Sequence, residues 1–233
     1  MKRHCIYLLL GLIGISDVGF GKAAPLVSIP THDAFFNSIK ALCGKAFQGK
    51  VSKDNVGNTF GDAELVMHVR KCTDSEIQIP FHVGDDASRT WILTKTGAGL
   101  LLKHDHRNKD GSFHSSTMYG GHTVDEGYAQ VQSFPADAYS KALFIESGIA
   151  ASTDNEWQIM IYSNRFSYRL IRPAREVQVD FDIDNTVSVP STPWGYKDWL
   201  RLKLDSGIVA FITTTPYNKF QIAYYILFQR TTR

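Results

Sequence analysis

The alternation of side chains in Gly99–Arg107 constrains the fold of this chain more than any other feature we consider. A period of two places two leucines and two histidines on one face of a strand, and mainly charged side chains on the other. The first face consists of Leu100, Leu102, His104 and His106, and the second of Leu101, Lys103, Asp105 and Arg107. Asp110-Gly111 follows, where glycine supplies the positive φ angle of a hairpin turn. This pattern is typical of an antiparallel sheet with one solvated side.

Further segments of the same kind follow at short intervals, separated by turns rich in Gly, Asp, Asn and Ser. The predicted strands are Gly49–Ser52, Glu64–Lys71, Glu76–Val83, Arg89–Lys95, Gly99–Arg107, Thr117–Tyr119, Tyr128–Phe134, Glu156–Tyr162, Phe166–Arg172 and Arg175–Ile183. Because no long helices separate them, these strands should pair antiparallel. The predicted fold class is therefore mainly β, either a lipocalin-like antiparallel barrel with an apolar interior or a sandwich.

Two helices accompany the strands. Residues 31–44 carry an apolar stripe, Thr31 is suited to cap the first turn, and Gly44 follows where a helix normally ends. We expect this N-terminal helix to pack on the sheet. A second, short helix is predicted over Pro135–Phe144.

The first 23 residues have the three parts of a secretory signal peptide. A basic start is followed by the apolar run Cys5–Ile15 and by small residues that include Gly21 and Ala23, after which we place the cleavage. The apolar run is too short to span a bilayer, and no later segment is long and uncharged enough to do so. We therefore expect a secreted or periplasmic protein without a transmembrane segment after signal removal.

The remaining chain divides by composition. Residues 31–190 are predicted to form a single β-rich domain, and residues 191–233 a C-terminal extension of uncertain structure. The extension contains the apolar run Gln221–Phe228, which would promote aggregation if it were exposed. It must pair with the sheet, bind a partner, or be an unstructured addition.

The charge balance excludes one class of partner. Removing residues 1–23 takes away three of 25 bases and one of 23 acids, so the mature chain is near neutral. Proteins that bind nucleic acids normally carry a basic excess, so nucleic acid is not expected as a partner.

Two cysteines, Cys43 and Cys72, remain in the mature chain. An even pair in an oxidising compartment indicates a disulfide, which would stabilise the fold by about 3–4 kcal/mol in the chain-entropy model. The alternative, a two-cysteine metal site, lacks further cysteines or a Cys-x-x-Cys motif.

Several blocks, taken in order, resemble a family of uncharacterised exported bacterial β-rich proteins. They are CGKAFQGKV, LVMHVRKC, IQIPFHVGDDASRTWILT, LKHDHRNKDGS, TMYGG, FPADAYSKALF and VDFDIDNTV…TPW, and they span about residues 35–194. The resemblance implies an exported protein but no reaction or ligand, because none is assigned to the family. The chain departs from the family pattern after Trp194.

His104, His106 and Trp91 are the candidate ligand-binding residues. Both histidines lie on the apolar face of one strand, where they would mark the wetter end of a barrel interior. Trp91 is expected to close an end of the barrel, stack on a ligand or pack in the core. The first functional hypothesis is therefore a non-enzymatic β-barrel that binds a small apolar molecule without a cofactor.

A second hypothesis is a metal-binding protein or metal-dependent enzyme of the cell envelope. His104 and His106 would bind zinc or another divalent metal together with His114 or His122. No HExxH motif supports it, and no Gly-x-Ser-x-Gly nucleophile motif is present. A third hypothesis is an envelope interaction protein, indicated only by Gln221–Phe228.

Overall fold

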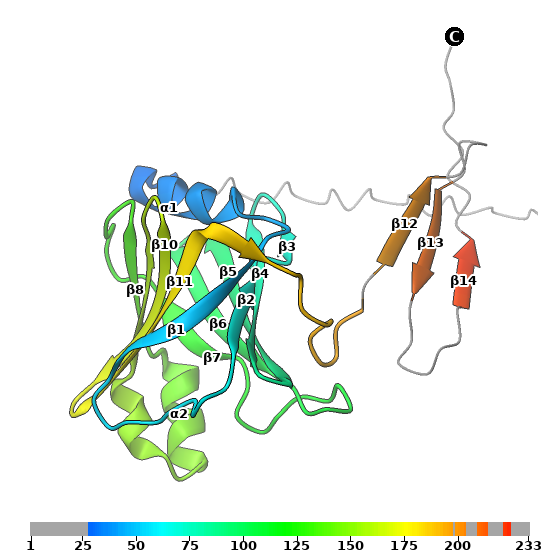
Figure 1. Ribbon diagram of the computed structural model, residues 1–233. Coiled ribbons are helices and arrows are strands. Elements are labelled where there is room, and N and C mark those ends of the chain that lie inside the picture. The colour runs from blue at the N-terminus through cyan, green and yellow to red at the C-terminus, as the bar shows by residue number, and fades with distance from the viewer. Residues whose placement is uncertain (1–27, 198, 204–208, 214–220, 225–233) are drawn as a thin grey trace, which may run out of the picture.

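The computed structural model describes residues 28–197, 199–203, 209–213 and 221–224. Its main element is an antiparallel sheet that curls into a nearly closed barrel (Figure 1). The strands are β1 (Ala46–Asp54), β2 (Leu65–His68), β3 (Lys71–Cys72), β4 (Glu76–Val83), β5 (Asp86–Thr96), β6 (Gly99–His106), β7 (Tyr119–His122), β8 (Val131–Pro135), β9 (Glu156–Ile161), β10 (Arg165–Arg172) and β11 (Arg175–Val187). The helices are α1 (Pro30–Lys40), α2 (Ala138–Glu146) and the 3-10 turn η1 (Ala150–Asp154).

The strands run round the barrel almost in chain order. The order across the sheet is β7-β6-β5-β4-β2-β1-β11-β10-β9-β8, and the short β3 pairs with β4 beside this path. Because β11 returns to pair antiparallel with β1, the two remaining edges, β7 and β8, come to lie next to each other. The fold class predicted from the sequence is thus confirmed as a barrel with an N-terminal helix packed on it.

At the seam between β7 and β8, no continuous ladder of strand hydrogen bonds closes the barrel. Instead, the backbones of the two strands lie in close contact. A Cβ atom at Gly121 would lie 1.8 Å from the carbonyl oxygen of Pro135. The amide of Asp137 donates to the Gly120 carbonyl at 2.9 Å, and the Gly120 amide donates to the Ser140 hydroxyl at 2.7 Å. Since Asp137 also caps α2, the start of this helix is part of the seam.

α1 covers the upper end of the barrel in Figure 1. Phe35, Phe36 and Ile39 are fully buried in the core, as the apolar stripe predicts, but the helix ends at Lys40 and not near Gly44 as predicted. Lys95 of β5 forms an ion pair with Asp33 of α1, and its ammonium group lies 4.9 Å from the centre of the Phe36 ring.

The start of this helix differs from the prediction. The N-cap residue is Ile29 without a side-chain cap, and Pro30 occupies the first turn. The Thr31 hydroxyl donates to the carbonyl of Glu126. Thr31 therefore joins α1 to the β7–β8 connection, which a local capping pattern cannot reveal.

The predicted disulfide is confirmed. Cys43 follows α1 and bonds to Cys72 of β3, with the two Cα atoms 6.2 Å apart. It fixes the chain after α1 to the sheet across 29 residues of sequence.

Large apolar side chains fill most of the interior, because inward positions alternate along each strand as predicted. The fully buried members include Phe47, Met67, Ile77, Ile79, Leu93, Phe134, Trp157, Phe166 and Phe181. At about 25 cal/mol per Å² of buried apolar surface, these rings and branched chains supply the dominant favourable term in folding.

A strap, residues 188–197, crosses the outside of β5 and β6. The Trp194 amide donates to the Ala87 carbonyl at 3.0 Å, and the Tyr196 hydroxyl donates to Asp105 at 2.6 Å. Asp105 faces outward, as the alternation predicts, but is only 2% exposed and is paired with Arg107. The strap thus explains how an outward carboxylate can be buried without an energetic penalty for an unpaired charge.

Three strands of the C-terminal extension form their own antiparallel sheet. These are β12 (Trp199–Lys203), β13 (Val209–Thr213) and β14 (Gln221–Tyr224). Of the three options for Gln221–Phe228, the described part pairs with β13 and not with the barrel sheet. The rest of this run and the predicted signal peptide lie outside the described residues. Among the described residues, no helix is long and apolar enough to span a membrane.

Replacing Gly121 by alanine tests the seam. The added methyl group would collide with backbone, which cannot move away without separating β8 from β7. We expect Gly121→Ala to lower the free energy of unfolding by about 1–3 kcal/mol, measured by urea denaturation. Gly97→Ala is the matched control, because a Cβ there meets no atom within 4 Å. Equal stability of the two variants would contradict the proposed closure.

Candidate ligand-binding site

Side chains do not fill the barrel completely. A cavity of about 160 Å³ remains at the end of β5 and β6 that lies away from α1. Its walls are mainly apolar and include Phe60, Phe81, Leu170 and Val177. The three residues predicted to bind a ligand, His104, His106 and Trp91, all line it.

Trp91 forms the centre of an aromatic stack. Its ring stacks on those of Phe81 and Tyr168, at centroid distances of 4.9 and 4.3 Å and with nearly parallel planes. Trp91 is only 2% exposed. Core packing is therefore its main role.

His104 is buried and held on both sides of its ring. Nδ1 lies 3.1 Å from the carbonyl oxygen of Tyr119 and therefore donates to it, and Nε2 lies 2.7 Å from the hydroxyl of Tyr168 and accepts a hydrogen bond from it. Burial lowers the pKa of His104 to about 3, so the ring is neutral at neutral pH. With both nitrogens occupied, His104 shapes the cavity and is not free to bind a metal or act as a base.

His106 and Arg89 lie beside each other on paired strands at the mouth of the cavity. His106 Nε2 and the Tyr119 hydroxyl lie 3.3 Å apart and share a hydrogen bond. Burial, and then the positive charge of Arg89, lower the pKa of His106 to about 4. Burial raises the pKa of Tyr119 to about 12, so this phenol keeps its proton and remains a donor.

The β1–β2 connection covers this end of the barrel with Thr59 and Phe60. The Phe60 ring packs edge-on against Phe81 at 5.5 Å. The base of the connection is fixed by Asp54, which accepts hydrogen bonds from the amides of Gly57 and Thr59 and pairs with Arg175. Thr59, Phe60 and Arg175 all line the cavity, so this connection is its cover.

A second cavity of about 370 Å³ lies directly outside the first. Arg89 and His106 line both cavities and form their common wall. The outer cavity also touches Lys109 and His114 of the β6–β7 connection and Trp194 of the strap.

The four histidines of the metal hypothesis do not converge. His122 pairs with Leu101, whose side chain lies on the outer face of β6, whereas His104 and His106 point inward. His114 is exposed and its Nδ1 accepts from the Ser116 amide, with its ring centre 6.3 Å from that of His106. Within the described residues, no three histidine, cysteine or acidic side chains are arranged to hold a metal.

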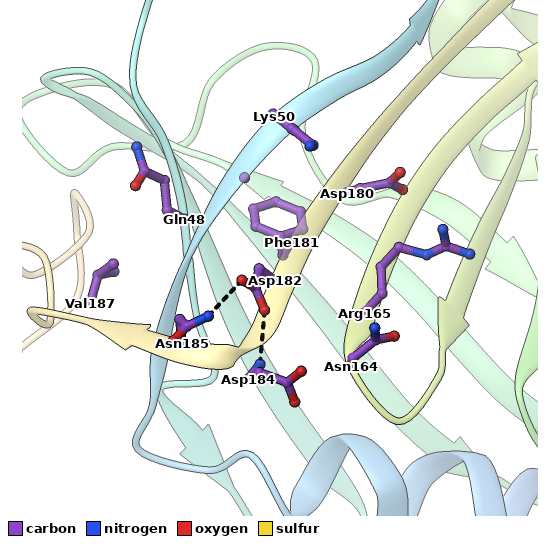
Figure 2. A pocket seen from close by; sticks show the side chains of 11 residues that line it. Gln48, Lys50, Asn164, Arg165, Asp180, Phe181, Asp182, Asp184, Asn185 and Val187 are labelled. Atoms are coloured by element: carbon purple, nitrogen blue, oxygen red, sulfur yellow. Dashed lines mark hydrogen bonds between the residues drawn. The ribbon is translucent and has the colours of Figure 1, made fainter.

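A larger surface groove lies elsewhere, on the outside of β1 and β11 (Figure 2). It has a volume of about 720 Å³ and forms where residues 182–185 of β11 bulge opposite Gln48 alone. Asp182, which lines it, accepts hydrogen bonds from the Asp184 amide and the Asn185 side chain. The groove is lined mainly by polar and charged residues, whereas the smaller interior cavity has mainly apolar walls and is lined by all three predicted ligand-binding residues. The interior cavity is therefore the stronger candidate site.

Comparison of the chain with protein-family models, curated proteins and solved structures gives no match. The resemblance to exported β-rich proteins therefore remains a prediction, and the site must be interpreted from its own geometry.

Sequence reasoning named three of the twelve described residues that line the cavity. Tyr168 alternates in phase with Phe166 and Leu170, which marks it as inward, but the link to His104 spans 64 residues. Arg89 contacts Asp86 of the same strand at 2.5 Å. Arg89 also lies at the mouth of the cavity, and this position could not be predicted because it depends on the curvature of the sheet.

The pKa of His104 predicts a pH dependence of stability. An unfolded histidine takes up a proton near pH 6.5, whereas the folded one does so only near pH 3. Unfolding therefore takes up a proton between these values, and stability falls as the pH falls, by at most about 1.4 kcal/mol per pH unit from this group. In urea denaturation between pH 7 and 4.5, His104→Gln should lose part of this dependence. His114→Gln, at an exposed site, should retain it, and identical pH profiles for the two variants would refute the assignment.

Proposed function

We propose that this chain is an exported, non-enzymatic protein that binds a small molecule in the interior of its barrel. The main support for the proposal is the 160 Å³ cavity, whose lining includes His104, His106 and Trp91, the three residues predicted from the sequence to bind a ligand. A cavity of about 150 Å³ with apolar walls is large enough to bind benzene. The ligand is thus expected to be no larger than a single ring with small substituents.

The arrangement of polar groups supports binding more than catalysis. His104 is neutral and fully hydrogen-bonded, and the Tyr168 phenol is occupied by it. These groups are rigid and few, as in binding sites where polar groups orient a ligand within apolar walls. The disulfide and the predicted signal peptide support function outside the cytoplasm.

Filling the cavity tests the proposal. Benzyl alcohol serves as a neutral probe of matching size, and its binding is followed by NMR titration. We expect saturable, roughly millimolar binding to the wild type and at least tenfold weaker binding to Leu170→Phe, because the added ring occupies the space that the probe needs.

Val124→Phe is the matched control, since Val124 is 76% exposed and does not line the cavity. It should bind the probe like the wild type. Equal binding by all three proteins would place the probe outside the cavity and contradict the proposal, as would absence of binding to the wild type.

A further inference from the structure

The interior cavity ends at a cation that is only partly neutralised. The Arg89 Nη1 atom contacts one oxygen of Asp86, whose other oxygen accepts from the Ser88 amide. A guanidinium has five N–H donors, and within the described residues the others of Arg89 have no hydrogen-bond partner. Arg89 is therefore able to bind a second anion while it keeps its contact with Asp86.

The positive charge of Arg89 reaches the interior groups. It lowers the pKa of His106, and it opposes the rise in pKa that burial imposes on Tyr119 and Tyr168. These three groups lie in the same cavity as Arg89. The mouth of the cavity thus has a positive potential, and a carboxylate placed there would be stabilised.

The outer cavity adds to this potential. Its only lining carboxylate in the described part of the chain is Asp86, whereas Arg89, Arg107 and Lys109 are cations. Asp105 neutralises Arg107 from behind, and Asp86 contacts Arg89. Lys109 is then a cation without a carboxylate partner among the described residues, so the outer cavity has a positive surplus.

We propose that the ligand is a small monocarboxylate with one apolar ring. The ring enters the interior cavity between Phe60, Phe81 and Leu170, and the carboxylate binds Arg89 where the two cavities meet. This inference rests on the proposed function and refines it, since a purely apolar ligand would leave the N–H donors of Arg89 unused.

The geometry favours this class for two reasons. The planar fork of a guanidinium matches a carboxylate, and such charge-assisted pairs are stronger than neutral hydrogen bonds. The described lining of the interior cavity contains no carboxylate that would repel the ligand. An ammonium-bearing ring of the same size would meet Arg89 and be repelled.

Isothermal titration calorimetry with benzoate, benzyl alcohol and benzylammonium tests the inference at neutral pH and low salt. The expected result is at least tenfold tighter binding of benzoate than of benzyl alcohol, with benzylammonium weakest. Arg89→Gln should abolish the preference for benzoate, and Arg89→Lys, which keeps the charge, should retain part of it. Lys141→Gln, which removes an exposed lysine of α2 outside both cavities, should bind like the wild type.

The outcomes separate the two proposals. If benzyl alcohol binds as tightly as benzoate and Leu170→Phe weakens both, the cavity binds ligands but the carboxylate preference is refuted. If Arg89→Gln and Lys141→Gln weaken benzoate equally, the effect is one of net charge and the assignment to Arg89 is refuted. If no probe binds the wild type, both the proposed ligand binding in the cavity and the proposed carboxylate preference are refuted. Circular dichroism of each variant confirms that it is folded before binding is compared.

Discussion

The close approach of two backbones at Gly120 and Gly121 is the constraint on which the rest of the structure depends. An open sheet would expose its interior rings and two unpaired edges, which proteins normally cover or pair. Here the edges meet where no side chain separates them, and Asp137 and Ser140 at the start of α2 satisfy the backbone groups of Gly120. Lys103 of β6 adds an ion pair to Asp137 across the seam.

Closure divides the barrel into a packed part and a partly empty part. α1 and the large rings fill the end near Lys95, and the disulfide fixes the chain that follows α1. At the other end, Arg89 and His106 replace apolar side chains at inward positions. The cavity lies between the buried His104–Tyr168 pair and the cover formed by Phe60. It coincides with the place where polar residues interrupt the apolar inward pattern.

The sequence predicts most of the strands and their faces, because the period of two in segments such as Glu76–Val83 directly reflects burial. The predicted strand Thr117–Tyr119, in contrast, shares only Tyr119 with β7. It also predicts the disulfide and the placement of His104 and His106 on the inner face. It cannot predict contacts that depend on closure, such as Thr31 with Glu126 or His104 with Tyr168, since nothing local encodes which distant strands meet. His122 is a related case, because its pairing with Leu101 turns its side chain outward, away from the inward-facing His104 and His106.

Native mass spectrometry of the mature protein from its own host tests the central claim most directly, that the interior holds a small natural ligand. The native mass is compared with the mass after denaturation. We expect an excess in the native mass, equal to that of a small ring-bearing acid, that disappears on denaturation and is absent from Leu170→Phe. A bare protein from its own host that also fails to bind benzoate would contradict the claim.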